Sequence, residues 1–203
     1  MIASILGGAV IFGCAGFCGV ILATLVCGKI APLEDSPHSR KVHPAAVIAG
    51  AALFGIVLAL RLTPVAQMGL SALICVPLAA AWYSDSLRGV IPDVFTLGPL
   101  AIVAGYVIIT HSWWIALSAA VPFVPFAVAA AFSKGRGMGW GDVKLVALGG
   151  AILGMQASIL VFGFACLAAT AVSVIHDRGK SPIAFGPYLV AAVILAMAVQ
   201  EHG

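Results

Sequence analysis

The sequence predicts an all-α, polytopic integral membrane protein with about eight transmembrane helices. The chain of 203 residues is 63% hydrophobic and only 8% charged, whereas charged residues make up about a quarter of a typical soluble domain. Its apolar runs come close to the roughly 20 residues that a helix needs to cross a bilayer, and short polar segments separate them. We therefore expect membrane lipid to surround these helices. The net charge of +3 is small and gives no indication of nucleic acid binding.

The apolar runs give the expected positions of the helices. These are about 3–27, 45–61, 65–84, 93–110, 113–133 and 184–200, with a further uncharged run over 145–175. We interpret the first as an uncleaved transmembrane helix, because it lacks a basic start and is longer than the apolar part of a signal peptide. The run 145–175 is too long for one upright helix and short for two.

The basic residues decide between one helix and two in this run. If 142–176 forms two helices, the loops after helices one, three, five and seven share one face. Those loops hold nine of the ten basic residues, which are Lys29, Arg40, Lys41, Arg88, Lys134, Arg136, Lys144, Arg178 and Lys180. The positive-inside rule then makes this face cytoplasmic and places both termini outside. With a single helix, Arg178 and Lys180 would lie outside. We therefore expect eight helices, with a break near 156–158.

Two acidic residues lie at the ends of apolar runs. Asp142 follows the stretch Gly137-Met138-Gly139-Trp140-Gly141 and precedes an uncharged run, so we expect it at or near a helix N-terminus. The alternate glycines allow another backbone to approach closely. Asp85 follows the apolar run 62–84, and we expect it in the loop after that helix. Both acids lie on the predicted cytoplasmic side under either helix count. Ionisable residues at this depth are costly, which makes them functional candidates.

Two such carboxyl groups are what an aspartic hydrolase needs. One carboxylate takes a proton from water, and the other, still protonated, gives a proton to the carbonyl oxygen. Two neighbouring carboxylates cannot both ionise easily, so their pKa values separate and their roles differ. We therefore predict Asp85 and Asp142 as the catalytic residues, with no metal and no other cofactor.

The order and spacing of these motifs resemble the type IV prepilin peptidase family, which are Gly-x-Gly-Asp aspartyl proteases. Asp85 precedes Ile91-Pro92-Asp93 at the family's spacing, and Gly139, Gly141, Asp142 and Lys144 match Gly-x-Gly-Asp-x-Lys. A Phe-Gly-Pro turn of the family is matched by 185–188, with the sequence Phe185-Gly186-Pro187-Tyr188. The resemblance covers about 62–200. It divides the chain into a two-helix region, 1–61, and a catalytic domain, 62–203.

The resemblance implies a membrane-embedded aspartic endopeptidase of the bacterial inner membrane, with its active site facing the cytoplasm. Its substrates would be type IV prepilins or pilin-like precursors with a short basic leader. Ile91 and Pro92 would fix the start of the next helix. Asp93 is interpreted as a third acid or, preferably, as a capping or hydrogen-bonding residue. Lys144 would pair with a carboxylate or a lipid phosphate, or serve only as a cytoplasmic anchor.

The first polar loop, 29–43, raises an alternative. Its sequence from Asp35 to His43 resembles the first cytoplasmic loop of polyprenyl-phosphate sugar-1-phosphate transferases, which use Mg²⁺, but the adjacent Asp-Asp pair of those enzymes is missing. A non-catalytic membrane assembly factor is a third interpretation. The loop also lacks the Cys-x-x-Cys pairs of bifunctional prepilin peptidases, so we expect no zinc and do not assign N-methyltransferase activity.

Overall fold

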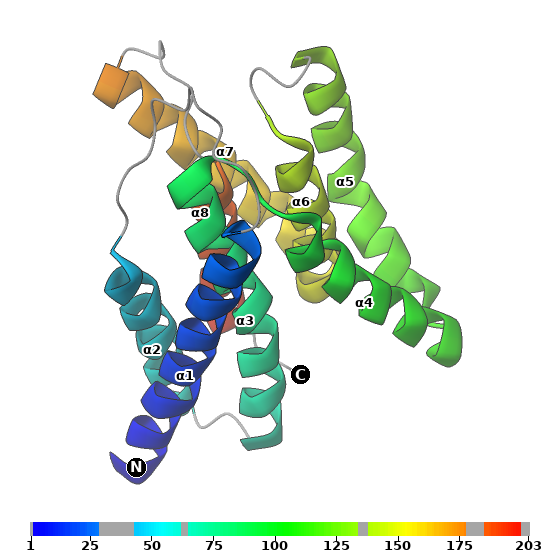
Figure 1. Ribbon diagram of the computed structural model, residues 1–203. Helices are drawn as coiled ribbons and strands as arrows, with labels where there is room; N and C mark the ends of the chain where they lie inside the picture. The colour runs from blue at the N-terminus through cyan, green and yellow to red at the C-terminus, as the bar shows by residue number, and fades with distance from the viewer. Residues whose placement is uncertain (1, 29–42, 62–64, 134–137, 178–184, 200–203) are drawn as a thin grey trace.

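The computed structural model describes residues 2–28, 43–61, 65–133, 138–177 and 185–199 (Figure 1). Within these ranges the chain forms eight α-helices and one short 3-10 helix, and no strand. They are α1 (Ile2–Cys27), α2 (Pro44–Leu60), α3 (Val65–Arg88), η1 (Asp93–Phe95), α4 (Leu97–Thr110), α5 (Trp113–Ser133), α6 (Trp140–Leu153), α7 (Met155–Asp177) and α8 (Gly186–Val199). The all-α prediction is confirmed for the described residues.

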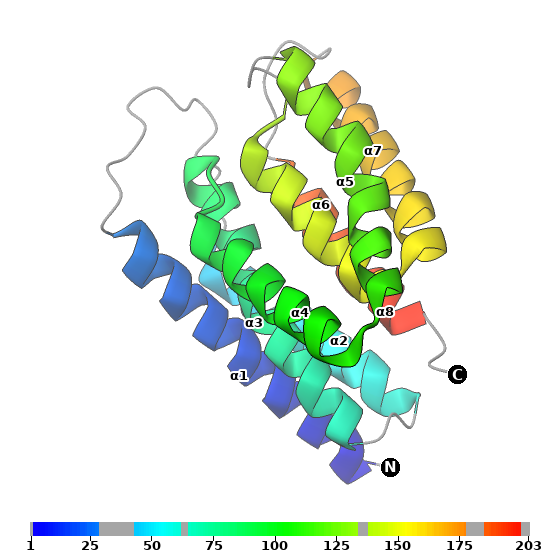
Figure 2. The ribbon, with the colours of Figure 1, turned by 90° about the vertical axis from the view of Figure 1, so that its right-hand side faces the viewer.

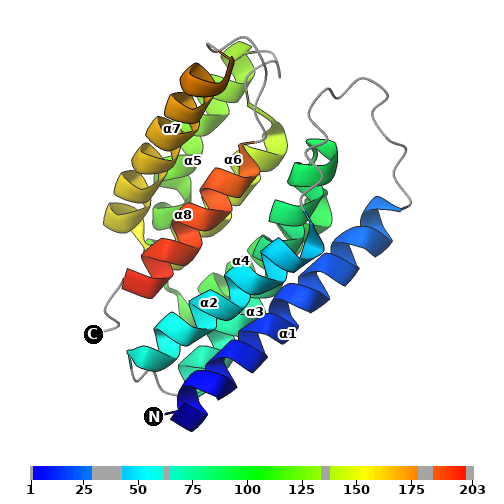
Figure 3. The same ribbon diagram turned by 90° about the vertical axis from the view of Figure 1, so that its left-hand side faces the viewer.

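The helices form two groups joined by α8. Helices α1, α2 and α3 pack together, α5 packs against both α6 and α7, and α4 contacts α5 and α6. Helix α8 packs against α2, α3, α6 and α7, so it contacts both groups. Figures 2 and 3 show that α3 ends, and α6 and α8 begin, at the same end of the bundle. Helix α1 begins at the opposite end of the bundle, and helix α8 ends there.

Several helices have the length and composition to cross a membrane. Five helical segments qualify, namely Ser4–Cys27, Gln67–Arg88, Asp93–Thr110, Trp113–Phe132 and Met155–Ile175, and the helices α2 and α8 are shorter but apolar. Large apolar side chains are exposed on these helices, including Phe132 and Ile175, each 84% exposed. Such surfaces suit lipid better than water. The number of membrane-spanning helices stays a prediction.

Helix α4 begins at Leu97 and not at the expected residue 93, because Asp93–Phe95 form η1. Two further helix boundaries also differ from the expected positions. The uncharged run after Asp142 does form two helices, but the break is at Gly154 and not at 156–158. Gly154 has a φ of +80°, which favours glycine over other residues. Helix α3 continues to Arg88, and Gly89, the residue that follows it, has a φ of +65°. Asp85 therefore lies in the last turn of α3, and the expected loop position is wrong.

Candidate active site

Asp85 is a buried carboxyl group at the end of α3. Its side chain is only 6% exposed. Its Oδ2 accepts a hydrogen bond of 2.9 Å from the backbone N–H of Gly186, the first residue of α8. The first N–H groups of a helix have no acceptor within the helix, and the positive end of the helix dipole favours a negative charge. The start of α8 thus stabilises the ionised form of Asp85.

Asp142 is similarly buried, at 7% exposure, but its hydrogen-bond donor lies at the start of its own helix. It lies in the first turn of α6, as the sequence predicted, and its Oδ2 accepts the N–H of Gly139 at 3.2 Å. Its other oxygen, Oδ1, is buried and has no hydrogen-bond partner among the described residues. Buried polar atoms are nearly always paired, so Oδ1 is the atom of this site that is available to a reacting group.

Ile91 joins the segments that carry the two acids. A Cβ atom added to Gly141 would lie 2.9 Å from the Ile91 Cβ and 3.2 Å from the Ile91 carbonyl oxygen. A Cβ atom added to Gly186 would lie 3.1 Å from the Ile91 Cδ1. Ile91 itself is buried, so it packs against both glycines without space for a side chain on either. Ile91 thus contacts both Gly141, the neighbour of Asp142, and Gly186, the hydrogen-bond donor to Asp85.

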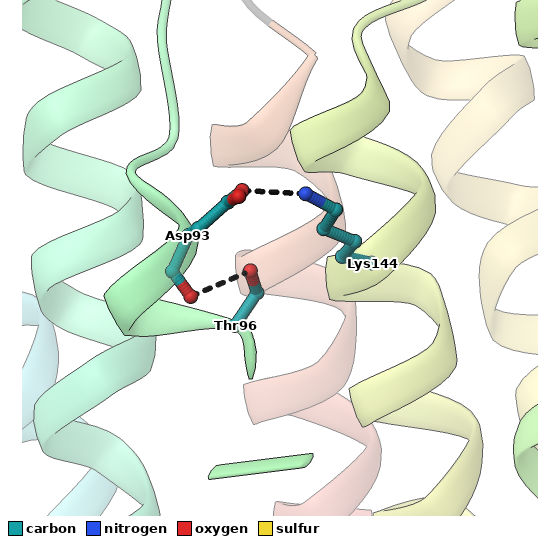
Figure 4. A network of polar contacts seen from close by, with 3 residues as sticks. All are labelled: Asp93, Thr96 and Lys144. Atoms are coloured by element: carbon teal, nitrogen blue, oxygen red, sulfur yellow. Dashed lines mark hydrogen bonds and ion pairs between the residues drawn. The ribbon is translucent and has the colours of Figure 1, made fainter. Parts of the chain in front are cut away.

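Asp93 and Lys144 form a second, more exposed contact between the two motifs. The Nζ of Lys144 lies 2.5 Å from the Oδ1 of Asp93, as Figure 4 shows. The side chains are 26% and 62% exposed, respectively. Pro92 is the N-cap residue of η1, and no side chain caps that helix; the carbonyl oxygen of Asp93, not its carboxylate, accepts the Thr96 hydroxyl. Asp93 is therefore an ion-pair partner and not a cap, and Lys144 has a carboxylate partner.

The structure thus brings together residues from all three sequence motifs. Gly186 was not among the predicted site residues, although it belongs to the Phe-Gly-Pro turn that the sequence contains. Its contact with Asp85 joins positions 101 residues apart, which no local pattern reveals. The transferase-like loop at 29–42 lies outside the described residues. Among the described residues, no group of three or more His, Cys, Asp or Glu side chains could hold a metal ion.

The arrangement can perform acid and base chemistry. Two buried carboxyl groups, each receiving one backbone N–H, approach from α3 and α6 at one end of the bundle. Their mutual electrostatic effect favours a state in which one is ionised and the other protonated. Such a pair can activate water and protonate a carbonyl oxygen in the same step.

Comparison with known proteins places these acids in a protein family. No curated protein and no solved structure matched the chain. A family model described as the type IV leader peptidase family matches residues 72–174, which are 103 of the chain's 203 residues. The match includes Asp85, the Ile-Pro-Asp segment and the Gly-x-Gly-Asp motif, whereas Gly186 lies beyond it. The chain therefore belongs to the type IV leader peptidase family, which implies aspartic protease activity.

Proposed function

We propose that the protein is an aspartic endopeptidase that removes the leader peptide of type IV prepilins or pilin-like precursors. The observation that carries the proposal is that Asp85 and Asp142 are both buried, and that Ile91 packs against the glycine before Asp142 and against the glycine that donates to Asp85. Membership of a leader peptidase family supports a protein substrate. The catalytic region would be 62–203, and 1–61 would support it through the packing of α1 and α2 against α3.

In the proposed mechanism Asp85 is the base and Asp142 is the acid. The N–H of Gly186 and the start of α8 favour a charged Asp85. An ionised Asp142 would leave a charged Oδ1 without a hydrogen bond, whereas a protonated Oδ1 can donate one to the substrate. Asp85 would take a proton from water as the water oxygen bonds to the carbonyl carbon, while Asp142 protonates the carbonyl oxygen.

The second half of the reaction reverses these roles. The proton on Asp85 passes to the amide nitrogen as the carbon–nitrogen bond breaks. The hydroxyl group formed from the carbonyl oxygen returns a proton to Asp142, which regenerates the carbonyl. Both products leave, and the dyad has the same protonation state as at the start. No metal or other cofactor takes part in this scheme.

We place the cleavage at the cytoplasmic face of the bacterial inner membrane. The basic residues support this orientation, since the sequence predicts nine of the ten on the side of the two acids. Most of those nine lie outside the described residues. Arg61 belongs to the opposite end of the bundle, where its Nη1 donates a hydrogen bond of 3.0 Å to the Val199 carbonyl at the end of α8.

Co-expression with candidate substrates tests the proposal. Tagged pilin-like precursors from the same genome are expressed with this protein in a host that lacks other prepilin peptidases. We expect a shorter precursor with the wild-type protein and none with Asp85→Asn or Asp142→Asn, because asparagine can neither accept the water proton nor supply a carboxylic one. Asp93→Asn should cause a smaller loss. Cleavage at near wild-type rate by either dyad variant contradicts the assignment.

Mass spectrometry of the processed pilin completes this test. The mass of the new N-terminus gives the cleaved bond, which we expect after a glycine. The chain has no Cys-x-x-Cys pair, so we propose that the new N-terminus carries no added methyl group. If no precursor is cleaved, the leader peptidase proposal is wrong, and a membrane assembly factor with the same scaffold becomes the better interpretation.

A further inference from the structure

We propose that Gly186 is a positioning residue of the active site, acting through Asp85. Its backbone N–H would hold the base in place, and its lack of a side chain would provide the space that this contact requires. The inference rests on the proposed catalytic role of Asp85. It extends the site beyond the matched family region, which ends at residue 174.

The first observation is that Gly186 is the available donor of its helix. The carboxyl oxygen of Asp85 accepts the Gly186 N–H at 2.9 Å, in a buried contact. Pro187, the next residue, has no N–H. The N–H groups of Tyr188 and Leu189 both point to the carbonyl oxygen of Phe185, at 3.0 and 3.3 Å. Hence the first turn of α8 presents one amide to Asp85, and that amide belongs to Gly186.

The second observation is steric. A Cβ atom added to Gly186 would lie 2.7 Å from the Asp85 Oδ2 and 3.0 Å from its Cγ. Both distances are too short, so a larger residue would push the carboxyl group away from its donor. The backbone of Gly186 does not have a positive φ, so alanine can adopt its conformation. The cost of a substitution would therefore fall on the contact with Asp85.

The third observation is that α8 is held firmly. Leu189, Val190 and Val193 on this helix are completely buried. Phe185 lies just before the helix, and the centroid of its ring is 6.4 Å from the ring centroid of Phe126 on α5. At the far end, Arg61 binds the last carbonyl group of α8. A helix fixed along its length presents the Gly186 amide at a defined position, which is what a precisely placed carboxyl base needs.

The kinetic test uses Gly186→Ala. We expect kcat for a tagged precursor that the wild-type enzyme cleaves to fall roughly 100-fold, with KM unchanged, since a displacement of about 1 Å at a reacting group can have this effect. Gly105→Ala is the matched control, because Gly105 lies in α4 with nothing within 4 Å of an added Cβ atom; it should leave kcat unchanged. Equal kcat in Gly186→Ala and wild type would overturn the proposal.

A double variant separates Asp85 from general packing. Ile91→Val removes the Cδ1 atom that also approaches Gly186. If the alanine acts through Asp85, Gly186→Ala combined with Ile91→Val should stay as impaired as Gly186→Ala alone. If the alanine acts only by disturbing Ile91, the double variant should recover activity, and the proposal is then wrong.

Hydrogen exchange tests the contact without any substrate. In detergent micelles the Gly186 amide should exchange at least roughly tenfold faster in Asp85→Ala than in wild type, because the amide loses its acceptor. Asp142→Ala removes the other acid and should leave this exchange rate unchanged. An unchanged rate in Asp85→Ala would contradict the positioning role. A response in exchange without cleavage of any precursor would retain the contact and refute only the proposed function.

Discussion

Asp85 and Asp142 have similar surroundings, but their hydrogen-bond donors come from different parts of the chain. Both are buried, and each accepts one backbone N–H. The donor to Asp142 lies three residues earlier, at the start of the same helix, whereas the donor to Asp85 lies 101 residues later, on α8. Asp142 therefore needs only the first turn of α6 to be oriented. Asp85 needs α3 and α8 to pack correctly, so its geometry depends on the whole bundle.

Among the glycine variants near the two acids, Gly141→Ala should lower kcat the most, because it disturbs the contact between the two motifs. An added Cβ atom would approach both the side chain and the backbone of Ile91. We expect kcat for precursor cleavage to fall roughly 100-fold. Gly139→Ala is the matched variant, since its Cβ would lie 3.5 Å from the nearest atom, an ordinary contact distance. Similar losses in the two variants would show that Ile91 does not align the acids.

Gly139→Pro should have an intermediate effect on Asp142 alone. The φ of −79° and ψ of 151° at Gly139 suit proline, which removes the N–H donor. A hydrogen bond contributes about 1 kcal/mol, or roughly a fivefold change in rate if the loss appears in the transition state. We expect Gly139→Pro to be slower than Gly139→Ala by about this factor. Equal kcat values for the two variants would mean that the local donor does not orient Asp142.

The hydrogen-bond donor of Asp142 is local in sequence and that of Asp85 is distant, which explains why the surroundings of Asp142 could be predicted and those of Asp85 could not. Asp142 precedes a long uncharged run, which indicates a helix start, and the structure confirms that position. For Asp85, the end of the apolar run suggested a loop, but the helix continues to Arg88, and Gly89 after it takes a positive φ. Its donor, Gly186, comes from another helix, and only tertiary packing brings it close. Sequence patterns report local contacts, and distant contacts need the structure.

The ion pair between Asp93 and Lys144 should have the smallest effect. Both side chains are partly or largely exposed, and exposed pairs typically contribute about 0.2–1 kcal/mol. A double-mutant cycle with Asp93→Asn and Lys144→Gln should give a coupling energy in this range for unfolding by SDS in micelles. A coupling above about 2 kcal/mol would show that the pair, rather than the contact of Ile91 with Gly141, is the main link between the motifs.

The most direct test of the dyad is a second double-mutant cycle, on Asp85 and Asp142 themselves. The rate of precursor cleavage is measured for the wild type, Asp85→Asn, Asp142→Asn and the double variant. Residues that act as one catalytic unit have strongly non-additive effects. We predict that each single variant loses nearly all activity and that the double variant is no slower than either. Losses that multiply in the double variant, or a single variant that retains substantial activity, would contradict a shared site.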